Sequence, residues 1–152
     1  PCNAVDQSDL VQNACVVVQV ASVFTYSERN FDKAADYCET HDNELREACY
    51  FSLGFHASAF LKTSDLEKLM QGCNCAGEDK TNFMQGLVRV WLKNETENYN
   101  SNQLCQTNNN EDKKDCYKNI SLMAEGYYDD PEALKNICSK AEEGYRDYCL
   151  GV

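Results

Sequence analysis

The stretch Cys38-Glu-Thr-His-Asp-Asn-Glu-Leu-Arg-Glu-Ala-Cys49 decides the fold of this chain. Its two cysteines stand 11 positions apart, enclose a polar span and precede a strongly apolar run. The spacing returns twice with both cysteines, once with methionine in the second position and once in a looser form: Cys105 and Cys116, Cys138 and Cys149, Cys73 and Met84, Cys2 and Cys15. The chain is therefore built from copies of one short unit.

The second position of this unit falls at residues 15, 49, 84, 116 and 149, so the steps are 34, 35, 32 and 33 residues. A period in this range indicates stacked helical hairpins. We predict an all-α, disulfide-stapled, α-solenoid-like domain over residues 1–152. Its four to five hairpins form a right-handed stack, with repeats at about 1–28, 29–62, 63–96, 97–128 and 129–152.

Residues four before the first cysteine and four after the second form one helical stripe, which stacked hairpins need for a continuous core: Ala34, Leu69, Ser101, Leu134, Leu53, Val88, Ile120. The periodicity also predicts a first long helix over residues 9–26, with a single apolar face: Leu10, Ala14, Val17, Val18, Ala21, Phe24. A second long helix is expected from Glu44 to Leu61, and Asp130-Pro131 is a strong helix start.

A cysteine at the end of one helix can reach a cysteine early in the next if the two helices are antiparallel. We therefore predict three bonds, Cys38–Cys49, Cys105–Cys116 and Cys138–Cys149. Each closes a loop of about 12 residues, worth somewhat under ~3 kcal/mol. The other four cysteines leave two alternatives open. One is local pairing, with Cys2–Cys15 and Cys73–Cys75 bonds, and the other is a long-range bond between repeats one and three.

The chain has 14 basic and 25 acidic residues, a net charge of −11, which argues against nucleic acid and anionic membranes as partners. Ten cysteines without a zinc-like cluster indicate disulfides and an oxidising, extracellular location, without a metal site. The sequence begins at Pro1 without a signal sequence, which fits a processed secreted chain, although a cloning boundary would give the same start. No apolar run reaches the roughly 18–20 residues of a membrane span.

The period and hairpin layout resemble tetratricopeptide-like solenoids. The cysteine pair of each hairpin is similar to the staples of Sel1-like repeats in secreted bacterial cysteine-rich proteins. The resemblance covers nearly the whole chain and is architectural, so it carries over no individual residue. It implies a binding scaffold without catalysis or cofactor.

Few residues suggest chemistry of their own. His56 lies seven residues after Cys49 on the same helix face as the core stripe, and we expect it to be a core histidine with its hydrogen bonds satisfied; His41 lies in a polar turn, where we expect it to be solvated. The pair Cys73 and Cys75 has no adjoining base that would lower a thiol pKa, so we expect no redox catalysis there. Two glycosylation sequons occur, with the loop entry at Asn94 favoured over the predicted helix around Asn119.

These observations predict a secreted, non-enzymatic structural or protein-interaction module. Apolar residues near the two ends of the chain favour head-to-tail self-association into an extracellular filament, with a C-terminal contact surface of Tyr145, Tyr148, Leu150 and Val152. The alternative is an extracellular carrier of small apolar ligands, whose cavity would be lined by His56, Trp91 and Met123. An enzyme ranks third, because the sequence contains no nucleophile–base or metal constellation.

Overall fold

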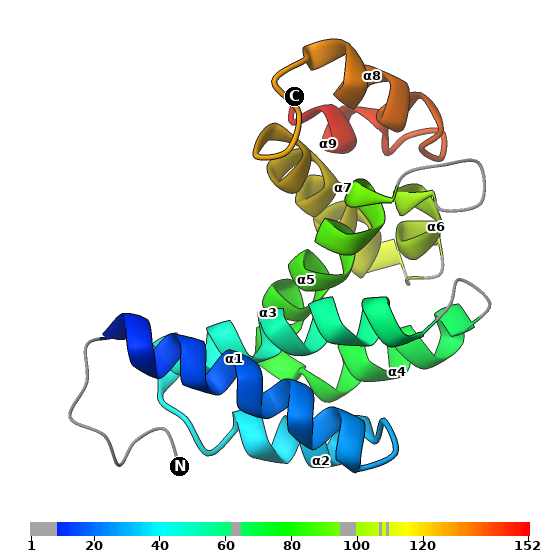
Figure 1. Cartoon of the computed structure of the whole chain (residues 1–152). Helices are drawn as coiled ribbons and strands as arrows, with labels where there is room; N and C mark the ends of the chain where they lie inside the picture. Colours follow the sequence, from blue (N-terminus) through cyan, green and yellow to red (C-terminus); the bar gives the residue numbers. More distant parts are fainter. Residues whose placement is uncertain (1–8, 62–64, 95–99, 107, 109) are drawn as a thin grey trace.

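The computed structural model describes residues 9–61, 65–94, 100–106, 108 and 110–152. Within these ranges the chain forms nine α-helices and one short 3-10 helix, with no β-strand (Figure 1). The first helix is α1 (Asp9–Tyr26). Four helix pairs follow: α2 (Phe31–Cys38) and α3 (Asn43–Phe60), α4 (Leu66–Cys75) and α5 (Lys80–Lys93), α6 (Ser101–Gln106) and α7 (Asn110–Glu125), α8 (Pro131–Ser139) and α9 (Arg146–Leu150). The all-α prediction is confirmed.

The odd-numbered helices form one row in which each packs against the next, from α1 through α3, α5 and α7 to α9. The short even-numbered helices lie beside this row, and α2 packs on α4 as α6 packs on α8. Because the order in space follows the order in the chain, α1 and α9 lie at opposite ends of the molecule (Figure 1). The right-handed sense of the stack stays a prediction.

Three disulfides join the last turn of a short helix to the following long or terminal helix. The Cα atoms are 5.5 Å apart in Cys38–Cys49, 5.4 Å in Cys105–Cys116 and 5.6 Å in Cys138–Cys149. All three predicted staples are therefore confirmed. Cys15 on α1 is also disulfide-bonded. Its predicted partner, Cys2, lies outside the described residues.

Local sequence explains where several helices begin. The Asn30 side chain accepts a hydrogen bond from the Lys33 backbone N–H at 3.0 Å and caps α2. At the start of α8, the Asp130 carboxylate accepts one from the Glu132 backbone N–H at 2.9 Å, and Pro131 occupies the first turn. These two caps fix where the first helix of the second and of the last hairpin begins.

The predicted core stripe is buried, with all its members except Leu134 at 0% exposure. The closest helix contact lies between α3 and α5, where glycines let the two backbones approach. A Cβ atom on Gly54 would stand 2.0 Å from the Phe83 carbonyl oxygen, and one on Gly86 would stand 2.0 Å from the Phe51 carbonyl oxygen. This crossing fixes the middle of the row.

The predicted apolar face of α1 is only partly buried. The fully buried side chains of α1 are Val16, Val20 and Phe24, whereas Leu10 is 78% exposed and Val18 is 65% exposed. The helix is apolar nearly all round, so periodicity alone could not say which side meets α2 and α3. Of the predicted face, Phe24 is buried, Val17 and Ala21 are half-buried, and Leu10, Ala14 and Val18 lie toward solvent.

Candidate functional site

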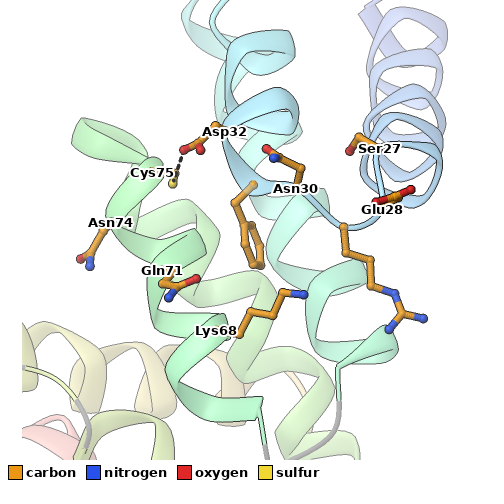
Figure 2. Close-up of a pocket in the computed structure, with 10 residues that line it drawn as sticks. Ser27, Glu28, Asn30, Asp32, Lys68, Gln71, Asn74 and Cys75 are labelled. Atoms are coloured by element: carbon orange, nitrogen blue, oxygen red, sulfur yellow. Dashed lines mark hydrogen bonds between the residues drawn. The ribbon is translucent and has the colours of Figure 1, made fainter.

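A polar cleft of about 580 Å³ lies where the turn between α1 and α2 meets α4 (Figure 2). Its charged lining consists of Glu28, Arg29, Asp32 and Lys68, two carboxylates and two cations. The amides of Asn30, Gln71 and Asn74 add hydrogen-bonding groups. Such a lining suits a small polar molecule held by hydrogen bonds.

The turn beside this cleft contains two non-glycine residues in the left-handed region, Glu28 with φ 59° and Arg29 with φ 62°. This conformation costs roughly 1–2 kcal/mol for each residue. The Arg29 backbone N–H donates to the Phe24 carbonyl at 2.8 Å, which closes the C-terminus of α1. The Arg29 guanidinium lies 5.9 Å from the centre of the Phe60 ring. The strain therefore accompanies the reversal that brings α2 back along α1.

The expected disulfide at Cys73 and Cys75 is not formed, because both residues are free thiols. Both lie in α4, where side chains two positions apart point about 200° away from each other, so the two sulfur atoms cannot meet. Nor does either cysteine reach repeat one by a long-range bond. Cys73 is fully buried in the core, 11 positions before Met84, which stands where the other hairpins carry a second cysteine.

The Cys75 thiol donates a hydrogen bond to the Asp32 carboxylate at 3.2 Å, across the gap between α4 and α2 (Figure 2). Burial, followed by the bond and the charge of Asp32, raises the pKa of Cys75 to about 11. Burial raises the pKa of Cys73 to about 12. Both sulfur atoms are therefore protonated at neutral pH, whereas a nucleophilic or redox-active cysteine needs its thiolate form.

His41 lies deeper in the protein, and His56 nearer its surface, than the sequence predicts. His41 is only 9% exposed, packs its ring edge-on against Tyr37, and has no hydrogen-bond partner for either ring nitrogen. The prediction that His41 is solvated is wrong, because its ring is buried against Tyr37. Burial lowers the pKa of His41, an effect that the nearby Asp42 charge opposes. His56 is half-buried between Phe55 and Phe60, and burial also lowers its pKa.

His56 and Phe60 form one wall of an apolar groove of about 330 Å³, and the outward side of α1 forms the other. Charged residues are absent from α1 between Leu10 and Tyr26, although 26% of the whole chain is charged. Large apolar side chains are exposed along this surface: Leu10 at 78%, Val18 at 65%, Tyr26 at 88% and Phe60 at 44%. Interface cores are depleted in charged residues, so this is the most partner-like surface that the structure describes.

The predicted C-terminal contact surface is only partly free. Tyr145, Tyr148 and Leu150 are half-buried against the chain's own core, whereas Val152 is 86% exposed. The Tyr145 ring stacks on Tyr117 with 5.4 Å between the ring centres. Lys113 lies over the Tyr145 ring and pairs with Glu142 at 2.8 Å. These tyrosines therefore hold α7 and α9 together.

The three residues predicted to line a ligand cavity occupy different surroundings. Trp91 is 1% exposed in the core, Met123 is half-buried on α7, and His56 lies in the groove beside α1. The structure does not gather them around one space.

The sequon asparagines also differ. Asn119 is 4% exposed and accepts a hydrogen bond from the Gln85 amide at 3.2 Å, so a glycan there would not fit this fold. Asn94 is exposed at the end of α5, with its amide bonded to the Val90 carbonyl at 2.8 Å. Its glycosylation stays a prediction.

Sequence reasoning placed an apolar contact region near the N-terminal end but did not identify which side of α1 is exposed; the uncharged run from Leu10 to Tyr26 was a readable signal. Within the described ranges, no three histidine, cysteine or acidic side chains are grouped to hold a metal ion. No described helix is both long and apolar enough to cross a membrane.

Comparison with protein-family models, curated proteins and solved structures finds no match to this chain.

Proposed function

We propose that this protein is a non-enzymatic structural and protein-interaction module that works outside the cell. The observation that supports this most directly is the uncharged, exposed side of α1. A surface that exposes Leu10, Val18 and Tyr26 to water is unfavourable in an isolated protein and favourable once a partner covers it. Its location on the terminal helix of the row makes it accessible to a large partner.

The chemistry of the other candidate site also favours a scaffold. The cleft between α2 and α4 contains a protonated thiol bonded to a carboxylate, and its charges balance. Neither feature activates a nucleophile. The stapled hairpins suit a rigid support, because three disulfides limit the freedom of the unfolded chain by about 3 kcal/mol each. Such bonds persist in an oxidising, extracellular compartment.

The finer proposal is that copies of this module build an extracellular filament. The row of helices has two different ends, the α1 side and the α9 side, where Val152 is 86% exposed. A subunit with a contact at each end forms a chain of subunits when the contacts do not close a ring. Negative-stain electron microscopy of the native protein tests this. Extended assemblies are expected, and monodisperse monomers at high concentration would count against the filament.

The second candidate is a carrier of small apolar ligands. The observation in its favour is the groove between α1 and α3, which is walled by Val17, Ala21 and Phe60 and closed on one side by His56. Native mass spectrometry of the protein purified from its source distinguishes the two functions. A bound small molecule that is lost in a Phe60→Asp variant supports the carrier, whereas ligand-free protein contradicts it.

A further inference from the structure

Among the described residues, the helix row has one neighbour position open beside α1. Helices α3, α5 and α7 each pack between two other helices of the row, one on each side. In the described part of the chain, α1 has a row neighbour on one side only, which is α3. Its other side therefore presents the kind of surface that elsewhere in this molecule meets another long helix.

The exposed side of α1 carries a heptad pattern. Val11, Ala14, Val18, Ala21 and Thr25 follow one another at steps of three and four residues, which places them on a single seam. Val11 is 43% exposed and Val18 is 65% exposed, so the seam lies at the surface. β-Branched residues alternate along it with alanines, a combination that lets a second helix approach closely.

We infer that this seam binds α1 of a second copy of this chain in a two-fold contact. This inference rests on the proposed function and names the partner at one of its contact surfaces. Two copies each carry a net charge of −11 and repel one another over most of their surface. The seam contains no charged residue, so two copies can meet there without bringing like charges together.

The seam also matches itself. Val11 and Thr25 each lie seven residues from Val18, so the pattern of large and small side chains is similar in both directions. A two-fold contact requires such self-complementarity, because the same patch must serve on both subunits. An 18-residue helix is about 27 Å long. A contact of that length lies at the small end of specific interfaces, so dissociation in the micromolar range is expected.

The test uses charge pairs at the centre of the seam. In Val18→Glu and Val18→Lys, like charges face each other across the two-fold axis, and the dimer dissociation constant is expected to rise at least ~10-fold for each variant alone. An equimolar mixture of the two variants pairs Glu with Lys across the axis and is expected to associate more tightly than either variant alone. Sedimentation velocity across micromolar concentrations measures all three samples.

A matched control is Leu122→Glu on α7, because Leu122 is 56% exposed and lies outside the seam. It is expected to leave the dimer unchanged. Should Val18→Glu lose its helical circular dichroism, Ala14→Glu on the same seam replaces it. The inference is overturned if the unaltered chain stays monomeric throughout this range, if Val18→Glu associates as well as Leu122→Glu, or if mixing restores nothing.

These outcomes separate the two-fold contact from the filament. If only dimers form, without longer assemblies, the α1 contact is supported and the filament proposal is wrong. If filaments persist in both Val18 variants, the filament proposal is supported and the α1 contact is wrong. If the unaltered chain is monomeric and a different protein binds at the seam, the interaction function is supported and the second copy is not the partner.

Discussion

The third hairpin has lost its staple, and replacing one residue should restore it. Met84 stands where the other hairpins have their second cysteine, 11 positions after the free thiol of Cys73. Cys73 is fully buried and Met84 is 3% exposed, so both side chains lie in the core between adjoining helices. In the three existing staples the Cα atoms are 5.4 to 5.6 Å apart at this same separation. We predict that the thiol introduced by Met84→Cys forms a disulfide with Cys73.

The expected gain follows from two opposing terms. Closing a loop of about 12 residues stabilises the folded state by about 3 kcal/mol in the chain-entropy account. Exchanging methionine for cysteine removes about two buried carbon-sized groups, which costs roughly 1.6 kcal/mol. The net effect is a free energy of unfolding about 1 kcal/mol above that of the unaltered chain.

The assay combines thiol counting under denaturing conditions with urea unfolding under non-reducing conditions. The unaltered chain has two free thiols among its described residues, Cys73 and Cys75, and Met84→Cys should have one. The matched control Met84→Ala loses the side chain without gaining a bond, and should be about 2–5 kcal/mol less stable than the unaltered chain.

A variant with three free thiols and the stability of Met84→Ala would refute this reasoning. It would show that the third hairpin does not share the geometry of its stapled neighbours, and that the lost cysteine reflects a different crossing of α4 and α5.

Three further predictions concern the helix crossing, the cleft and the buried histidine. Gly86→Ala should destabilise the protein by about 1–3 kcal/mol in urea unfolding, because its Cβ meets the α3 backbone, whereas exposed Gly126 should accept alanine at little cost. Asp32→Asn should speed iodoacetamide alkylation of Cys75 at about pH 8, because it removes the negative charge that, together with burial, raises the thiol pKa, and an unchanged rate would contradict the assigned contact. Burial lowers the pKa of His41, so below about pH 6.5 the unfolded chain binds a proton that the folded chain resists, and stability falls as pH falls. A His41→Gln variant should show a shallower loss of stability between about pH 7 and pH 5, and an equal slope would reject this role.

Features of the candidate sites that depend on residues close together in the sequence could be predicted, whereas contacts between residues far apart in the sequence could not. The Cys38–Cys49 staple was predictable because a fixed spacing of 11 residues meets a capped helix start, and both features act within one hairpin. The contact between Cys75 and Asp32 joins residues 43 positions apart, and no local pattern announces it. The glycosylation preference could be argued from sequence, since Asn119 falls within a predicted helix beside the core residue Ile120.

The sequence by itself determined the all-α class, the paired helices and their three staples, because helix periodicity, capping and short loop closure depend on neighbouring residues. Only the tertiary structure decided which side of α1 faces water, that His41 is buried, and that Cys73 and Cys75 remain thiols. The physical reason is that a helix apolar on every side has no preferred orientation of its own. Its buried face is chosen by the helices that pack against it, and here α2 and α3 together bury Val16, Val20 and Phe24 and leave Val18 exposed.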